Sequence, residues 1–359
     1  MYEKTFFRIF LLLTSVVSSW AQTFYVNNIR YKVTSADEFT VAVIGLRSDY
    51  DITSIVIPES VTIGSKTYSV TAIDSYAFQD CKTLTSVTIG NNVRTIGYQT
   101  FAFCYNLTSV DIGNSVAMID ELAFRDCRSL TSIIIPNSMT TIIGSAFGGC
   151  CSLTSVTIPS SVTMLDGNAF SGCSGLERIV VETGNPVYDS RNNSNAIIET
   201  ASNTLISGCK NTVIPNNVTR IACCAFDGCI SLTFITIPNS VTEIEDWAFS
   251  YCTGLKDVYC FAENVPITDI EAFYRVNVSS LTLHVPTASL LDYSMTEPWS
   301  DFGQIVPIGE GGGIEQVRGN TNYTNQSVYD LYGRRTTKMQ KGINILRDAD
   351  GGIKKVLRK

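Results

Sequence analysis

Residues 77–89 read Ala-Phe-Gln-Asp-Cys-Lys-Thr-Leu-Thr-Ser-Val-Thr-Ile, and close variants of this unit return six more times along the chain. Successive copies lie 23 residues apart, except for one wider interval between residues 169 and 225 that leaves room for an enlarged repeat. One such unit cannot bury its own apolar face, so a fixed period of this length predicts stacked units that share one continuous core.

Each unit predicts one coil of the stack. The L-x-x-V-x-I half alternates apolar and polar residues, which favours a short strand with Val and Ile inward. A Pro or Gly, such as Gly90 or Pro159, ends that strand and begins a turn. We interpret A-F-x-x-C as one tight helical turn that places Phe and Cys in the core.

The predicted fold is a β-rich solenoid of about ten rungs. Its strands are expected to start near Ile52, Leu84, Leu107, Leu130, Leu153, Leu176, Cys209, Leu232, Leu255 and Ser280. The repeated phenylalanines should form the structural core column, and truncating one of them to alanine should cost about 3–5 kcal/mol. This core column comprises Phe78, Phe101, Phe124, Phe147, Phe170, Phe226 and Phe249.

These repeats resemble the BspA-like leucine-rich repeat family over about residues 50–307. The stretch from Gly184 to Pro215 is also similar to the enlarged repeat of that family. The resemblance implies a leucine-rich-repeat-like solenoid in an exported surface protein of a Gram-negative bacterium. Because some family members are adhesins that bind host matrix or plasma proteins, it also implies protein binding and adhesion.

The chain begins with a predicted signal peptide at residues 1–21. Lys4 and Arg8 precede an apolar run from Ile9 to Val17, and small residues at Ser19 and Ala21 fit a cleavage site. A short membrane anchor is the alternative, although the run is shorter than the roughly 20 residues that span a bilayer. No transmembrane segment is expected in the mature chain.

The remaining chain divides into four parts. Residues 22–51 predict an N-terminal β cap of hairpins, and residues 52–308 predict the solenoid, with its enlarged repeat at 182–215. A Gly-rich linker follows at 309–315. Residues 316–359 carry ten basic and three acidic residues, whereas residues 22–315 carry 14 basic and 29 acidic residues. This change of charge marks a boundary.

The basic tail resembles the C-terminal sorting domain of type IX secretion cargo. The resemblance rests on the order of three segments: VYDLYGR at 328–334, KGINIL at 341–346 and IKKVL at 353–357. It implies passage across the outer membrane and association with the cell surface. The alternatives are a small β appendage without a sorting role and a basic patch that binds nucleic acid.

Composition argues against catalysis and against nucleic-acid binding. The formal net charge of −7 opposes a general affinity for nucleic acid or anionic membranes. The single histidine, His284, leaves almost no basis for a Ser-His-Asp or Cys-His mechanism or for a multi-histidine metal site. We therefore predict no catalytic, cofactor-binding or metal-binding residues, and interpret the chain as not an enzyme.

The twelve cysteines have mostly structural explanations. Seven occupy one repeat position and predict an inward column of small, buried thiols; disulfides between neighbouring rungs are the alternative. Cys209 and Cys260 replace core residues of the strands, whereas Cys151, Cys223 and Cys224 fall outside the column. The column comprises Cys81, Cys104, Cys127, Cys150, Cys173, Cys229 and Cys252.

Outward strand positions provide the candidate binding face. The early rungs carry mainly Ser and Thr there, but the pattern breaks from Arg178 onward, with Phe234 and Tyr259 predicted to point outward as contact anchors. The alternative is that these aromatics pack against residues 182–208. A protein partner is the first expectation and a glycan the second; a structural spacer without a specific ligand is the other alternative. The predicted face comprises Arg178, Val180, Asn211, Val213, Phe234, Thr236, Asp257 and Tyr259.

Overall fold

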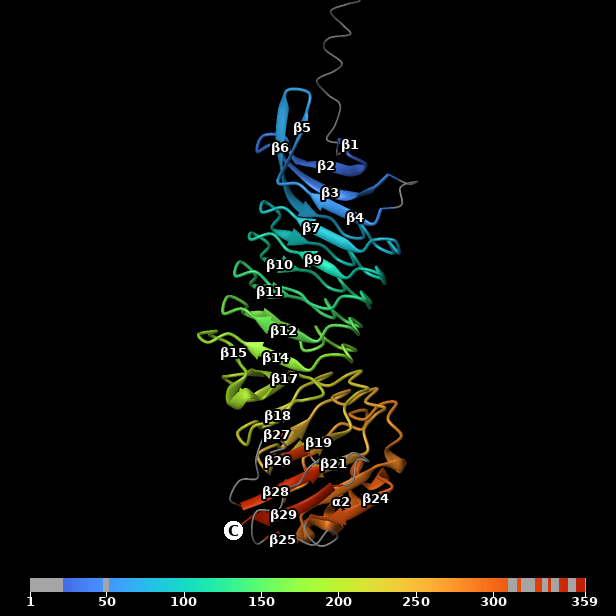
Figure 1. Ribbon diagram of the computed structural model, residues 1–359, viewed down its shortest axis with the longest axis vertical. Coiled ribbons are helices and arrows are strands. Elements are labelled where there is room, and N and C mark those ends of the chain that lie inside the picture. The colour runs from blue at the N-terminus through green and yellow to red at the C-terminus, as the bar shows by residue number, and fades with distance from the viewer. Residues whose placement is uncertain are drawn as a thin grey trace, which may run out of the picture.

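The computed structural model describes residues 22–47 and 52–308, and it also describes the backbone of five strands between residues 315 and 358. Short coils stack along the long axis of the molecule, as the sequence predicts (Figure 1). The predicted signal peptide lies outside the described residues. Within the described part of the chain, no helix is long and apolar enough to cross a membrane.

One side of the solenoid, here called the long-strand wall, is built from the predicted L-x-x-V-x-I strands. They pair in parallel so that equivalent residues meet; Ile55, for example, lies beside Val87, and Val87 beside Val110. Residues 132–135 and 211–214 follow the same path without forming a regular strand. The wall consists of three sheets: β4 (Ser54–Ile57), β7 (Ser86–Ile89) and β9 (Ser109–Asp111); β12 (Ser155–Ile158) and β14 (Arg178–Val181); and β19 (Phe234–Ile237), β21 (Asp257–Cys260), β23 (Thr282–Val285) and β24 (Gln304–Pro307).

A second side, the short-strand wall, was not predicted. Its strands are mostly two residues long, and they pair in parallel at the V-x-x-I segment, so that Ile96 lies beside Ile119 and Ile119 beside Ile142. Each of these isoleucines is buried. The wall contains β6 (Lys66–Ile73), β8 (Thr95–Ile96), β10 (Met118–Ile119), β11 (Thr141–Ile142) and β13 (Met164–Leu165), and after the enlarged repeat β18 (Arg220–Ile221), β20 (Glu243–Ile244) and β22 (Ile267–Thr268).

The A-F-x-x-C segments form the third side, here called the turn ridge, and the prediction of a helical turn there is wrong. The residues before Ala and before Cys adopt left-handed backbone angles, with φ of 60° at Leu122 and 56° at Asp126. Such angles break a right-handed helix and produce two successive tight turns instead. The Phe124 amide then donates to the Ala146 carbonyl of the next rung at 2.7 Å.

The predicted phenylalanine column exists, but it forms two stacks. Rings from Phe78 to Phe170 stack with centroids 5.2–5.5 Å apart, and a second stack begins at Phe226. Phe249 and Phe273 continue it, and Phe273 was missed in the sequence because a valine replaces the usual Cys of its repeat. The described core correspondingly divides into two clusters that meet at the enlarged repeat.

The enlarged repeat forms a small antiparallel sheet that is continuous with the short-strand wall. β15 (Tyr188–Asp189), β16 (Ala196–Glu199) and β17 (Thr204–Gly208) pair in that order, and β17 then pairs in parallel with β18. A short 3-10 helix, η1 (Arg191–Asn193), joins β15 to β16. Gly208 lies against the Phe226 ring, so the backbone of β17 packs directly on this ring.

Both ends of the solenoid carry additional structure. At the N-terminus, β1 (Thr23–Val26), β2 (Ile29–Ser35) and β3 (Thr40–Leu46) form an antiparallel meander that pairs with β6, and β5 (Ser60–Ile63) forms a hairpin with β6. At the other end, Trp299 is completely buried against Phe273, Tyr293 and Phe302. This end contains η2 (Val278–Ser280), η3 (Thr287–Ser289), α2 (Leu290–Met295) and η4 (Trp299–Asp301).

The basic tail has a β backbone, in line with the predicted appendage. Its strands form one sheet in the order β25–β29–β28–β26–β27. The first strand begins at Glu315, the last residue of the predicted linker, and the rest of that linker lies outside the described residues. The strands are β25 (Glu315–Val317), β26 (Ser327–Asp330), β27 (Arg335–Thr336), β28 (Gly342–Arg347) and β29 (Ile353–Arg358).

Candidate binding surfaces

The predicted binding face lies on the long-strand wall, but it is split between two sheets. Arg178 belongs to β14, whereas Phe234 and Asp257 are paired neighbours on β19 and β21. Between these sheets, the Val213 amide donates to the Ser194 carbonyl of the enlarged repeat at 2.9 Å. The structure therefore brings Phe234, Thr236, Asp257 and Tyr259 together, and places Arg178, Val180, Asn211 and Val213 beside the enlarged repeat.

A residue missed by the prediction, His284, belongs to the same face. It lies on β23 directly beside Tyr259, and the two rings stack with centroids 4.1 Å apart and planes 8° apart. The His284 Nε2 atom lies 3.0 Å from Asp257 Oδ1. Burial, with a smaller contribution from Asp257, raises the pKa of Tyr259 to about 12, so its hydroxyl stays protonated at neutral pH.

Phe234 and Tyr259 are half-buried rather than fully exposed. Tyr259 stacks on the next strand of its own wall, which differs from the alternative of packing against the enlarged repeat. Tyr259 can stack in this way because side chains on neighbouring strands of a sheet lie close enough for two flat rings to cover one another. The face thus combines flat ring surfaces with an ionisable pair, Asp257 and His284.

A second group of aromatic side chains lies on the turn ridge of the last rungs. Trp247, Tyr251 and Tyr274 are 44%, 48% and 39% exposed. The Trp247 indole N–H donates to Glu271 Oε2 at 2.9 Å, and the Arg275 guanidinium lies 5.3 Å from the centre of the Tyr274 ring. This group was not predicted, although most other copies of the repeat carry small or polar residues at the positions of Trp247 and Tyr251.

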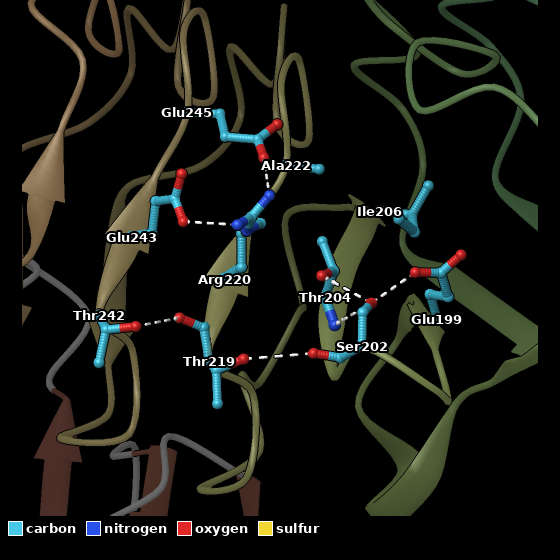
Figure 2. Close-up of a pocket in the computed structure, with 10 residues that line it drawn as sticks. All are labelled: Glu199, Ser202, Thr204, Ile206, Thr219, Arg220, Ala222, Thr242, Glu243 and Glu245. Carbon is cyan, nitrogen blue, oxygen red and sulfur yellow. Dashed lines mark hydrogen bonds and ion pairs between the residues drawn. The ribbon is translucent and has the colours of Figure 1, made fainter.

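The enlarged repeat creates a groove of about 440 Å³ on the short-strand wall (Figure 2). Arg220 lies at its centre, with Nη2 2.7 Å from Glu243 Oε2 and Nη1 3.0 Å from Glu245 Oε1. Across the groove, the Ser202 hydroxyl donates to a Glu199 carboxylate oxygen. The remaining lining residues are Thr204, Ile206, Thr219, Ala222 and Thr242.

This groove was not predicted, because it lies between the enlarged repeat and the short-strand wall, and the sequence pattern predicted neither the strands of that repeat nor that wall. Its lining offers hydroxyls, carboxylates and one guanidinium, all of which can hydrogen-bond a polar ligand. Both carboxylates beside Arg220 are already paired with it. The described residues contain no group of three or more His, Cys, Asp or Glu side chains placed to hold a metal ion.

The thiol column lies in the core from Cys104 onward, with Cys81 only partly buried, and every cysteine that the structure describes is a free thiol. Five of its seven thiols donate to the carbonyl of a phenylalanine in a neighbouring rung: Cys127 Sγ, for example, donates to the Phe101 carbonyl at 3.3 Å, and Cys150 Sγ to the Phe124 carbonyl at 3.3 Å. Burial raises the pKa of Cys127 well above its usual value, which disfavours the reactive thiolate. These cysteines therefore act as small core residues that satisfy backbone carbonyls.

The fold and these surfaces define a class: a β-solenoid of short coils whose outer walls, rather than one deep cleft, present its polar and aromatic groups. A family model described as the BspA type leucine-rich repeat region matches residues 46–177 and 193–296 in six copies. The chain belongs to this BspA-type leucine-rich repeat family.

Solved structures share this fold. A leucine-rich repeat protein from Bacteroides ovatus is 26% identical, over 79% of this chain and 76% of that one, with a TM-score of 0.55. A leucine-rich cell surface protein from Faecalibacterium prausnitzii is 24% identical, over 81% and 96%, with a TM-score of 0.50. The pneumococcal vaccine antigen PcpA is 17% identical, over 82% and 100%, also with a TM-score of 0.50. A search of curated proteins finds no match.

Proposed function

We propose that this chain is an exported, non-catalytic surface protein that binds another protein through the last rungs of its long-strand wall. The contrast between the two halves of that wall carries the proposal. Outward positions of β7 and β12 hold Ser and Thr, whereas β19, β21 and β23 present Phe234, Tyr259 and His284. Aromatic side chains are frequent anchors of protein interfaces, and serine is not.

Family membership supports the surface location. One solved neighbour is described as a leucine-rich cell surface protein, and the N-terminal sequence has the pattern of a signal peptide. We assign the basic tail, residues 316–359, the role of a type IX sorting signal. Fractionating cells that express the chain with and without this tail tests that role; surface display that is unchanged by the deletion contradicts it.

The experiment for binding uses the mature chain, residues 22–359, as bait for matrix and plasma proteins. The affinity of the captured protein is then measured against a Phe234→Ala/Tyr259→Ala variant. The matched control is Ser109→Ala/Thr157→Ala, which alters outward positions on earlier strands of the same wall. We expect the aromatic variant to lose at least about tenfold in affinity, while the control stays unchanged. Equal affinities of the two variants would refute this choice of face.

A glycan is the second candidate ligand, and the groove favours it. Sugars present many hydroxyls, and the groove surrounds one guanidinium with carboxylates and hydroxyls that complement them. Arg220→Gln should abolish binding to a glycan array if the groove is the site, whereas Phe234→Ala should leave that binding intact. A chain that binds neither proteins nor glycans would instead be a structural spacer.

A further inference from the structure

Two thiols meet on the turn ridge directly after β18. The Sγ atoms of Cys223 and Cys224 lie 3.3 Å apart, and both side chains are half-buried, so small solutes can reach them. The other close thiols of the chain belong to the thiol column, whose members from Cys104 onward are buried. Proximity and access therefore coincide at Cys223 and Cys224.

The repeat explains how these neighbours meet. Cys224 has a φ of 59°, and the equivalent residues Ser145 and Trp247 have φ of 51° and 53°. The left-handed conformation is thus a feature of the turn and is not a distortion produced by the thiols. In this copy of the turn, cysteines occupy two consecutive positions, 223 and 224, and their sulfur atoms lie side by side.

The chain contains a natural comparison in Cys150 and Cys151, which are also adjacent in sequence. There the thiols diverge: Cys150 Sγ donates to the buried Phe124 carbonyl at 3.3 Å, whereas Cys151 is exposed and its Sγ lies 3.3 Å from the Gly149 carbonyl. Adjacency in sequence alone therefore does not bring two sulfur atoms into contact in this fold.

We propose that Cys223 and Cys224 form a reversible redox site, which small disulfides such as oxidised glutathione convert to a vicinal disulfide. One cysteine thiolate attacks the glutathione disulfide, forms a mixed disulfide and releases one glutathione thiolate. The second cysteine attacks the mixed disulfide at the protein sulfur and releases the other glutathione. The protein loses two hydrogens and gains one S–S bond, and the two protons end on the two reduced glutathione molecules.

Such a bond would be labile rather than a permanent cross-link. The Cα atoms of adjacent residues lie about 3.8 Å apart across a trans peptide. Unstrained disulfides join Cα atoms at least about 4.4 Å apart, so the eight-membered ring is strained and readily reduced. This property suits a site that responds to the redox state around an exported protein, where oxidation is possible.

The site is connected to the groove through one carboxylate. The Cys223 amide donates to Glu245 Oε2 at 2.9 Å, and Glu245 Oε1 accepts from Arg220 Nη1 at 3.0 Å. Glu245 and Arg220 both line the groove (Figure 2). Closing the ring reorients the peptide between the two cysteines, so oxidation should alter the support of Glu245 and thereby the groove.

Burial raises the pKa of both thiols, and the Asp246 carboxylate adds to the shift. The thiolate is the attacking species, so the reaction should be slow at neutral pH and accelerate as the pH rises. Below the thiol pKa, each pH unit should raise the rate about tenfold.

The test treats the reduced full chain with oxidised glutathione and follows intact mass, with fragmentation to locate each change. We expect loss of two hydrogens at residues 223–224 and addition of one glutathionyl group at the solitary exposed Cys151. In Cys224→Ser, the remaining thiol lacks a partner, so it should retain a glutathionyl group instead. Serine already occupies the equivalent turn positions at Ser75 and Ser145, which indicates that serine variants at both positions fold.

Two outcomes would overturn the proposal. One is stable glutathionyl groups on both Cys223 and Cys224 of the unaltered chain, which would show that the thiols do not resolve one another. The other is no reaction at either residue at alkaline pH while Cys151 is modified. Loss of the intramolecular bond in Cys223→Ser, with restoration of free thiols by mild reductant in the unaltered chain, would support it. This result is independent of which partner the long-strand wall binds.

Discussion

Phe124 provides the most quantitative test of the shared core. Its side chain is completely buried, and its ring stacks on Phe101 at 5.2 Å and on Phe147 at 5.4 Å, with planes 11° and 3° apart. Phe124→Ala would remove the middle ring of a five-ring stack. The neighbouring rings belong to separate rungs that are held by backbone hydrogen bonds, so they cannot easily close the gap.

The expected loss follows from burial and stacking. Truncation of a buried phenylalanine typically costs about 3–5 kcal/mol, and the cost is largest where the site cannot collapse. Offset or stacked ring pairs contribute about 0.5–1.5 kcal/mol beyond the buried area. Because Phe124 loses two such pairs, we expect a decrease of about 4–5 kcal/mol in the free energy of unfolding.

Urea unfolding, followed by far-ultraviolet circular dichroism, measures this loss. The matched control is Ile134→Ala, which also removes a large apolar side chain but at a position that is 83% exposed. The control should change the free energy of unfolding by less than about 0.5 kcal/mol. A loss below about 1 kcal/mol for Phe124→Ala, or losses of equal size in the two variants, would refute the shared core.

Two further predictions concern the enlarged repeat. Gly208→Ala should destabilise the chain by about 1–3 kcal/mol, because a Cβ there would lie 2.3 Å from a Phe226 ring atom. The control is Gly144→Ala, where the atom nearest to the added Cβ is 3.4 Å away. Equal melting temperatures of the two variants would contradict this packing. Although burial opposes it, hydrogen bonds from Arg191 hold the pKa of Asp189 below its usual value. Asp189→Asn should therefore destabilise at pH 7, with a difference that fades as the pH falls below about 4; a difference independent of pH in thermal melts would exclude this ion pair as the cause.

The repeat alone was sufficient to predict the solenoid, the inward Phe and Cys positions and the long-strand wall. Each of these depends on local alternation or on a fixed period, which one sequence displays. The short-strand wall was missed because a two-residue strand such as β8 has no periodicity to detect. The helical turn was wrong because left-handed residues such as Leu122 carry no sequence signal when they are not glycine.

The surfaces were harder to predict than the core. Phe234 and Tyr259 lie on paired strands of the long-strand wall, but the stacking of Tyr259 on His284 depends on the register between β21 and β23. The groove depends on the enlarged repeat, whose three strands carry no copy of the 23-residue pattern. The contact between Cys223 and Cys224 likewise depends on backbone angles that the sequence does not state.

The most direct test of the proposed function is the affinity of the mature chain for the protein it captures, compared between Phe234→Ala/Tyr259→Ala and Ser109→Ala/Thr157→Ala. The proposal predicts that the dissociation constant rises at least about tenfold in the first variant and does not change in the second. Unchanged affinity in the first variant, with both variants folded, would show that the last rungs of the long-strand wall are not the binding face.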